Sequence, residues 1–144
     1  MKAQYLTLFT SLARFLDALR RGDQAMRLIA LSADMASVTA IANDYGFESF
    51  FPRQVEGLMM SDDVLLGLFT SGNSENIGMA FLKAREKQGK TILLSGRDGG
   101  KLKRLADIAI TVPENNTARI QEYHECIYHI LCELVESPHH ARNV

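Results

Sequence analysis

Residues 62–76 read DDVLLGLFTSGNSEN, and the other segments can be placed relative to this stretch. Its apolar part, residues 64–69, shows no polar alternation, which is typical of a parallel strand covered by helices on both faces. The strand runs into a polar turn, residues 70–74, after which a helical pattern begins. Ligands of α/β folds bind at this carboxyl end of a strand, so the turn is the first candidate site.

The polar turn admits two interpretations. It brings Thr70, Ser71, Asn73 and Ser74, together with Gly72, to the start of a helix, where unpaired backbone N–H groups favour an anion such as phosphate. The same residue types also cap helices and form turns, so Ser74 could be a plain N-cap and Gly72 a turn residue. From the turn alone both interpretations stay open.

The composition limits the class of protein. The chain has 144 residues, 47% of them hydrophobic and 23% charged, which suits one soluble globular domain. Its formal net charge is −1, so we expect no direct nucleic-acid binding. No apolar run is long enough for a membrane span, and the amino terminus lacks a signal-peptide pattern. We therefore expect a cytoplasmic protein that does not bind membranes.

The periodicity predicts strands that alternate with helices. We expect an amino-terminal helix within residues 1–24, an α/β unit over residues 25–137 that forms one structural domain with this helix, and a tail over residues 138–144. About four strands are predicted, at residues 27–32, 64–69, 90–95 and 107–112. The predicted helices lie within residues 4–21, 34–46, 50–60, 76–88, 102–105 and 117–136, and Pro138 is expected to end the last one. This alternation predicts a parallel sheet with helices on both faces.

Four motifs carry a family resemblance: TAIANDYGF at residues 39–47, TSGNS at 70–74, GRDGG at 96–100 and TARIQE at 117–122. In this order and spacing they resemble the phosphoheptose isomerases, which are sugar isomerase (SIS) domain enzymes. Those enzymes convert sedoheptulose 7-phosphate to glycero-manno-heptose 7-phosphate for lipopolysaccharide and related glycans. The resemblance extends from about residue 27 to residue 136 and implies a SIS-like, flavodoxin-like α/β three-layer sandwich.

The resemblance also implies roles for single residues. Thr70, Ser71 and Ser74 would bind the phosphate of a small-molecule sugar phosphate, and Asn73 of the same turn would also contact the substrate. Asp44 would hold sugar hydroxyls. These five residues, together with Gln121 of the last predicted helix, are the expected substrate-binding set.

Two residues of the last predicted helix would serve the reaction itself. By resemblance His129 would be the acid/base residue, and Gln121 and His129 would both be candidate zinc ligands, with Gln121 near the reacting end. Aldose–ketose exchange moves a proton between adjacent carbons, and histidine titrates in the right range for that step. A zinc ion could stabilise the oxyanion that develops.

The spacing of Gln121 and His129 sets a constraint of its own. Eight residues span about 12 Å along a regular helix, so the two side chains of one straight helix do not easily meet. Either the helix begins after Gln121, or each site combines residues from neighbouring subunits. Both options favour a homo-oligomer, a dimer or a tetramer. Glu125 lies one turn before His129, so an ordinary hydrogen-bonded pair is also possible there.

The chain departs from the family pattern at its amino terminus. It contains no Gly-Asn-Gly-Gly-Ser loop, and the positions of the family's catalytic His and Glu fall on Tyr5 or Thr10 and on Phe9 or Arg14. The missing strand lies inside the family's sheet, so the sheet would have to re-pair its edges.

This departure leaves two functions open. One is a phosphoheptose isomerase. The other is a noncatalytic SIS adaptor that resembles the protein associated with the replication initiator DnaA and shares several of these motifs. Absence of the His/Glu helix favours the adaptor, whereas Gln121 and His129 favour the enzyme.

Overall fold

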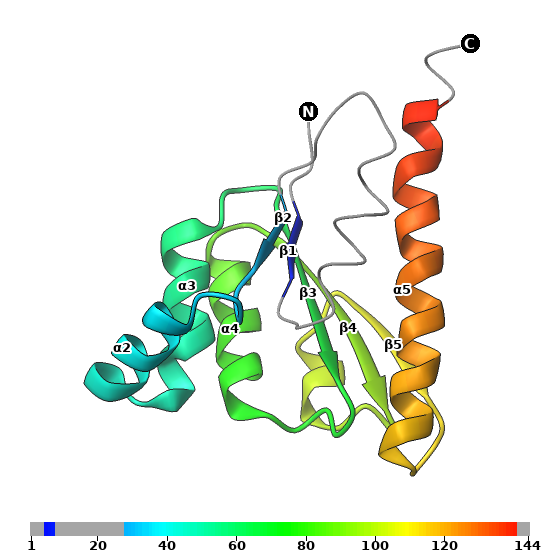
Figure 1. Cartoon of the computed structure of the whole chain (residues 1–144), viewed down its shortest axis with the longest axis horizontal. Helices are drawn as coiled ribbons and strands as arrows, with labels where there is room; N and C mark the ends of the chain where they lie inside the picture. The colour runs from blue at the N-terminus through cyan, green and yellow to red at the C-terminus, as the bar shows by residue number, and fades with distance from the viewer. Residues whose placement is uncertain (1–4, 8–27, 141–144) are drawn as a thin grey trace.

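Five parallel strands form one sheet in the computed structural model, which describes residues 5–7 and 28–140, with side chains for residues 28–135 (Figure 1). The order across the sheet is β2-β1-β3-β4-β5, and every neighbouring pair is parallel. The strands are β1 (Tyr5–Thr7), β2 (Leu28–Ala30), β3 (Val64–Phe69), β4 (Lys90–Gly96) and β5 (Ile108–Val112). The predicted parallel sheet is confirmed, and β3 has the predicted bounds.

Helices cover both faces of this sheet, which confirms the expected three-layer α/β sandwich (Figure 1). One layer contains α2 (Met35–Tyr45), α3 (Phe50–Leu58) and α4 (Glu75–Glu86), with the 3-10 turns η1 (Phe47–Ser49) and η2 (Lys101–Arg104). The other face carries α5 (Thr117–His140). Among the described residues, no helix combines the length and the apolar character that crossing a membrane requires.

Each face of the sheet has its own hydrophobic core. The larger core lies under α3 and α4 and is built from Leu31, Phe50, Phe51, Val55, Met59, Leu65, Ile77, Ala80, Phe81, Ala84, Leu93 and Leu102. The smaller core lies under α5 and contains Leu66, Leu68, Leu94, Tyr128 and Cys132. Successive residues of β3 alternate between the two cores, as they must in a strand that is buried on both sides.

The amino-terminal segment corrects one prediction. Sequence periodicity predicted a helix over residues 4–21 and about four strands, but Tyr5–Thr7 is a strand. Tyr5 is in register with Leu28 of β2 and with Val64 of β3, so β1 is an inner strand. An inner strand forms backbone hydrogen bonds on both sides, and this outweighs the weak local preference for helix. The other residues of the predicted helix, 8–21, lie outside the described residues.

The carboxyl-terminal helix also extends further than predicted. Pro138 was expected to end it, with a tail over residues 138–144, but α5 continues to His140. A proline inside a helix removes one backbone hydrogen bond and can bend the helix without ending it. Residues 141–144 lie outside the described residues.

Candidate functional site

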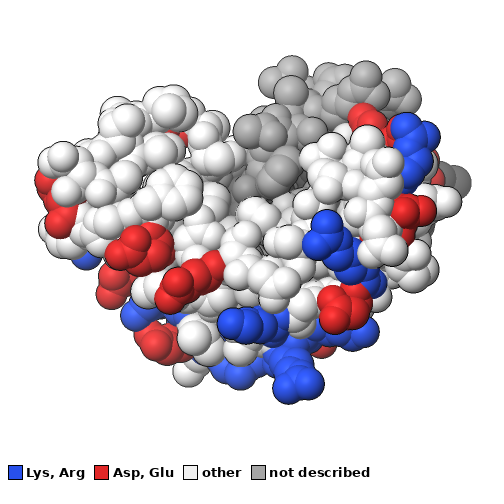
Figure 2. Space-filling view, turned by 90° about the horizontal axis from the view of Figure 1, so that it is seen from below, with Lys and Arg blue, Asp and Glu red and all other residues white. Residues whose placement is uncertain are grey.

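The candidate site lies where the order of the strands reverses. The chain passes from β1 to β2 on one side of the sheet and from β3 to β4 on the other, so the reversal falls between β1 and β3. In open α/β sheets, ligands bind outside the carboxyl ends of the strands at this point. The turn at residues 70–74, here called the 70–74 loop, follows β3 directly. Figure 2 views the molecule from this edge, where Lys and Arg side chains gather with Asp and Glu among them.

A second loop, residues 96–100, supports the 70–74 loop. Gly72 has a φ of 64°, and a Cβ atom added there would lie 2.1 Å from the carbonyl oxygen of Gly99. The Gly72 carbonyl accepts a hydrogen bond of 2.9 Å from the Leu102 amide. Only glycine allows this backbone conformation and this approach without strain. Gly72 is therefore more than a generic turn residue, because it lets the two loops touch.

Ser74 stands at the N-cap position of α4, but its side chain makes no capping hydrogen bond. At two other helix starts the side chain does cap the helix: the Asp34 carboxylate accepts a hydrogen bond of 3.1 Å from the Ala36 amide, and Asn116 caps α5. Ser49 at the start of α3 makes no cap bond either, but its hydroxyl donates to the Tyr45 carbonyl at 2.9 Å. The hydroxyl of Ser74 and the first N–H groups of α4 are therefore not paired with each other as in an ordinary cap. The plain-cap interpretation of this serine does not describe the structure.

The first turn of α4 carries no Lys or Arg side chain that could attract an anion. The first turn of this helix contains one charged residue, the exposed Glu75, and the basic residues Lys83 and Arg85 lie in its last turn. An anion at this helix start would therefore depend on hydroxyl and N–H groups and on the helix dipole.

Asn73 is engaged at both ends of its side-chain amide. Its Nδ2 donates a hydrogen bond of 2.9 Å to the Ser71 carbonyl, and its Oδ1 accepts one of 3.1 Å from the Lys101 amide. The second contact joins residues 28 positions apart in the sequence. This asparagine therefore bridges the 70–74 loop and the start of η2.

The first turns of α5 lie against the same edge of the sheet. A Cβ atom added at Gly96 would lie 2.3 Å from Cδ1 of Ile120 and 2.7 Å from the Thr70 carbonyl oxygen, so helix and loop approach this strand end together. Gln121 follows Ile120 and is exposed. The structure therefore brings the start of α5, which carries Gln121, close to the 70–74 loop.

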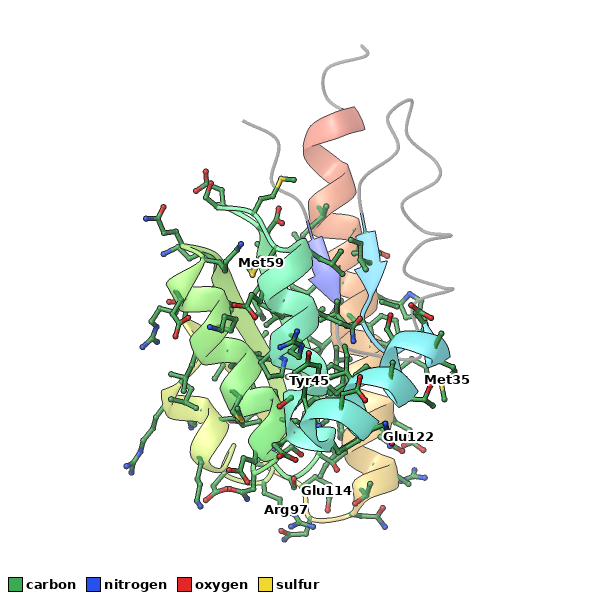
Figure 3. The ribbon with its side chains drawn as sticks, turned by 90° about the vertical axis from the view of Figure 1, so that its left-hand side faces the viewer. Met35, Tyr45, Met59, Arg97, Glu114 and Glu122 are labelled. Atoms are coloured by element: carbon green, nitrogen blue, oxygen red, sulfur yellow. The ribbon has the colours of Figure 1, made fainter. Side chains whose placement is uncertain are left out.

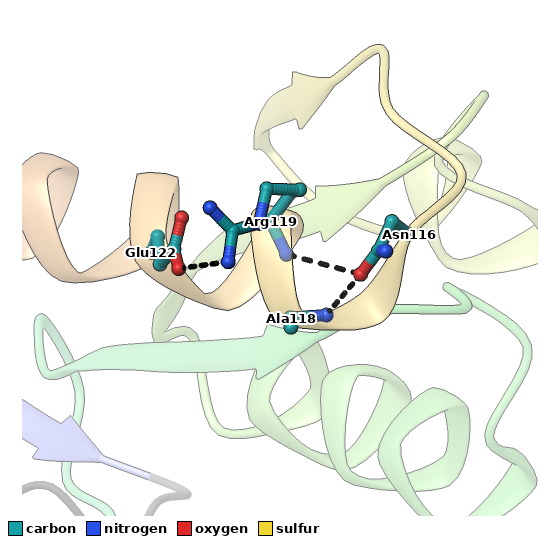
Figure 4. A network of polar contacts seen from close by, with 4 residues as sticks. All are labelled: Asn116, Ala118, Arg119 and Glu122. Carbon is teal, nitrogen blue, oxygen red and sulfur yellow. Dashed lines mark hydrogen bonds and ion pairs between the residues drawn. The ribbon is translucent and has the colours of Figure 1, made fainter.

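The start of α5 is held by its own side chains (Figure 4). Asn116 Oδ1 accepts hydrogen bonds from the amides of Ala118, at 2.9 Å, and Arg119, at 3.4 Å. Arg119 forms an ion pair of 2.6 Å with Glu122. The carboxylate of Glu114 accepts hydrogen bonds from the next two backbone amides, which lowers its pKa. An asparagine directly before a helical pattern is the sequence signal for such a cap.

Gln121 and His129 do not come together in one chain. The helix α5 begins at Thr117, so the option of a helix that starts after Gln121 is wrong. From the carboxyl edge α5 runs back along the sheet, away from the loops (Figure 1). His129 is half-buried there, with its ring 4.8 Å from the ring of Tyr128. The hydroxyl of Tyr128 donates to the Glu125 carboxylate at 3.3 Å.

The residues expected to bind zinc do not form a site within the described part of one chain. No three His, Cys, Asp or Glu side chains of residues 28–135 are placed together so that they could hold a metal ion. Gln121 and His129 are separated by more than two turns of one helix. These two residues of a single chain therefore do not fit one zinc ion, and zinc binding stays a prediction.

Asp44, the expected ligand of sugar hydroxyls, lies in the last turn of α2. Its side chain is exposed, and its Oδ1 accepts a hydrogen bond of 2.9 Å from Nδ2 of Asn43. The next residue, Tyr45, is covered by the guanidinium of Arg53, 3.8 Å from the ring centroid. Figure 3 shows Tyr45 on the α2 side, whereas Arg97 lies at the end of the molecule formed by the loops after the strands.

Sequence reasoning missed one buried polar side chain near the site, His124. It is 5% exposed, and its Nε2 has no hydrogen-bond partner among the described residues. Burial lowers the pKa of His124, and a hydrogen bond with the backbone of Ser95 acts in the opposite direction. The sequence pattern that indicates its burial is the four-residue spacing of Ile120, His124 and Tyr128, which places all three on the face of α5 that packs against the sheet.

Comparison with known proteins gives consistent matches. The SIS domain family model matches residues 30–127. A phosphoheptose isomerase of Helicobacter pylori is 50% identical over 113 residues, which are 78% of this chain and 59% of that relative. A phosphoheptose isomerase of Nitratiruptor is 49% identical over 124 residues, which are 86% of this chain and 66% of that relative. The solved phosphoheptose isomerase of Neisseria gonorrhoeae superposes with a TM-score of 0.86 at 36% identity, over 94% of this chain and 77% of that one.

The matches cover this chain better than they cover its relatives. The chain spans about three fifths of the length of the Helicobacter pylori relative, for which the share is 59%. All three proteins named above are phosphoheptose isomerases, the family that the four sequence motifs resemble.

Proposed function

This chain belongs to the SIS domain family and within it to the phosphoheptose isomerases, and we propose that it binds a sugar phosphate at the 70–74 loop and isomerises it. The substrate proposed from the family is sedoheptulose 7-phosphate, and the product is glycero-manno-heptose 7-phosphate. The same family relation suggests a cytoplasmic enzyme that supplies heptose for lipopolysaccharide.

The observation that carries the proposal is the start of α4. Ser74 occupies the N-cap position without capping the helix through its side chain, and half-buried Thr70 and Ser71 add two more hydroxyls. A phosphate can accept hydrogen bonds from these hydroxyls and from the free N–H groups of the first turn. An ordinary cap would use the serine hydroxyl for the helix itself, as Asp34 and Asn116 use their side chains.

The proposed reaction transfers one proton between adjacent carbon atoms. A base removes the proton from the carbon next to the carbonyl group, and the carbonyl oxygen takes up a proton, which gives an enediol. A proton then returns to the former carbonyl carbon while the hydroxyl of the neighbouring carbon loses its proton, so that the carbonyl group has moved by one carbon. We assign the acid/base role to His129 and a role in orienting the substrate to Gln121. Asp44 would accept hydrogen bonds from the sugar hydroxyls, because an exposed carboxylate has free acceptor positions.

This assignment requires more than one copy of the chain. His129 lies more than two turns of α5 beyond Gln121, and the helix leads away from the 70–74 loop. A neighbouring copy would have to supply one of these side chains to each site. We therefore propose a homo-oligomer whose active sites combine residues of two chains, and any zinc site formed by Gln121 and His129 would need the same arrangement.

The test is an isomerisation assay with sedoheptulose 7-phosphate on the wild-type chain and on His129→Ala. We expect turnover in the wild type, loss of turnover in the variant, and nearly equal binding of substrate by both. Glu133→Ala, an exposed change on the same helix, serves as the control. Binding without turnover in the wild type would contradict the isomerase proposal and favour the noncatalytic one. Absence of binding would contradict the whole proposed site.

A further inference from the structure

One side chain, Asn73, joins the two loops at the carboxyl edge of the sheet. By sequence it belongs to the expected substrate-binding set, but both ends of its amide are bound within the protein. We propose that Asn73 is a positioning residue, which fixes the shape of the 70–74 loop through the start of η2. This inference rests on the proposed function, because the shape it explains is that of an anion site.

The first step of the argument is the use of the amide. The Nδ2 atom donates to the Ser71 carbonyl at 2.9 Å, and the Oδ1 atom accepts from the Lys101 amide at 3.1 Å. Both distances are those of good N–H···O bonds. Nδ2 keeps a second N–H and Oδ1 a second lone pair, so the argument rests on the orientation of the amide, which these two bonds fix within the protein.

The second step is the fit between the loops. The Leu102 amide donates to the Gly72 carbonyl at 2.9 Å. A Cβ atom added at Gly100 would lie 2.5 Å from the Gly72 carbonyl oxygen and 2.7 Å from Oδ1 of Asn73. Gly100 also has a φ of 56°, which other residues adopt only with strain. The hydrogen bond between Asn73 and the Lys101 amide therefore requires a glycine at position 100.

The third step links this contact to anion binding. The hydrogen bond from Asn73 holds the carbonyl of Ser71, a residue whose hydroxyl belongs to the proposed phosphate site. If that carbonyl were free to turn toward the anion, its partial negative charge would oppose binding. A loop that is already ordered also loses less conformational entropy when the ligand arrives. Asn73 can therefore raise the affinity for phosphate without touching it.

The experiment is a double-mutant cycle with inorganic phosphate and sedoheptulose 7-phosphate as titrants. The variants are Asn73→Ala, Gly100→Ala and the combination of the two. Loss of the contact should weaken binding about tenfold in each single variant. Gly100→Ala removes the Asn73 contact and also crowds the Gly72 carbonyl, so the double variant should bind about as weakly as Gly100→Ala alone and better than the product of the two single effects. Asn115→Ala, an exposed asparagine outside both loops, should bind like the wild type.

The results distinguish a failure of the positioning role of Asn73 from a failure of the proposed function. If the effects of the two changes multiply, or if Asn73→Ala binds like the wild type, the positioning role is wrong. If the wild type binds neither titrant, the proposed function fails. A second measurement, hydrogen exchange of the Lys101 amide, tests the contact with Asn73 directly. It needs no ligand, and it does not depend on the Gly100→Ala variant, whose loop could unfold. Faster exchange of Lys101 in Asn73→Ala than in Asn115→Ala is expected, and equal rates would overturn the inference.

Discussion

Gln121 and His129 lie on one uninterrupted helix, α5, and their eight-residue separation places them about 12 Å apart along its axis. Gln121 lies in the second turn, close to the carboxyl edge of the sheet, where Ile120 approaches Gly96. His129 lies further along the helix, beside Tyr128. If both residues serve one reaction, they must come from different copies of the chain.

Mixing of inactive variants tests this arrangement. Gln121→Ala and His129→Ala should each be inactive alone, because every site then lacks one residue. Oligomers that contain both variants should regain part of the activity, since one class of interface then combines an intact Gln121 with an intact His129. Isomerase activity after co-expression, compared with the separately purified variants, is the measurement. Mixed oligomers without any activity would show that the two residues do not share a site across chains.

The buried His124 predicts a loss of stability in mild acid. Burial lowers its pKa below the ordinary value of 6.5, so the folded protein resists taking up a proton that the unfolded chain accepts. The free energy of unfolding should therefore fall as pH drops below about 6.5, by at most about 1.4 kcal/mol per pH unit for this group. In His124→Leu the slope should be smaller. Urea unfolding at pH 7.5 and pH 5.5 measures both slopes, and equal slopes would contradict the prediction.

Asp107 and Thr91 predict a second effect, at lower pH. Asp107 Oδ2 accepts hydrogen bonds of 2.8 Å from the hydroxyl and from the amide of Thr91, which lower the pKa of Asp107 below 3.8. The stabilisation is present above that pH and is lost as pH falls through the lowered value. Thr91→Val should cost about 1 kcal/mol near neutral pH.

The stability difference between Thr91→Val and the wild type should become smaller as pH falls below 3.8, the ordinary value for this carboxyl group. Chemical unfolding at pH 7 and pH 3 provides the measurement, with Asp107→Asn as a second variant that cannot ionise. A difference that stays constant between the two pH values would show that the carboxylate form is not what Thr91 stabilises.

The cap of α5 gives a prediction for local stability. Asn116 Oδ1 accepts from the amides of Ala118 and Arg119, so Asn116→Ala should lower the free energy of unfolding by about 1 kcal/mol. The neighbouring Asn115→Ala should have little effect. Thermal unfolding of the two variants distinguishes these cases, and equal melting temperatures would contradict the role of the cap.

The sequence predicted the central elements of the fold because their signals are local. The apolar run of β3 ends at the polar residues Asp63 and Thr70, and the observed strand, Val64–Phe69, has the predicted bounds. The prediction from sequence failed at β1, because the strands that pair with Tyr5–Thr7 are distant in the sequence: Leu28–Ala30 and Val64–Leu66. A helical pattern near the terminus concealed a pairing that only the folded sheet provides.

The candidate site shows the same division between local and distant contacts. The hydroxyls of Ser71 and Ser74 could be found from a short motif after a strand. The role of Asn73 could not, because its partner Lys101 is 28 residues away. Absence of a side-chain cap at Ser74 was also beyond prediction, since its residue type fits a cap and a phosphate site equally well.

The measurement that tests the account most directly is an isothermal titration of sedoheptulose 7-phosphate into the wild-type chain and into the double variant Ser71→Ala, Ser74→Ala. Loss of two hydrogen bonds to a charged phosphate should weaken binding by at least about 100-fold, with an unchanged melting temperature. Ser61→Ala, an exposed serine outside the loop, should leave the affinity unchanged. Equal affinity of the double variant and the wild type would contradict a sugar-phosphate site at the start of α4.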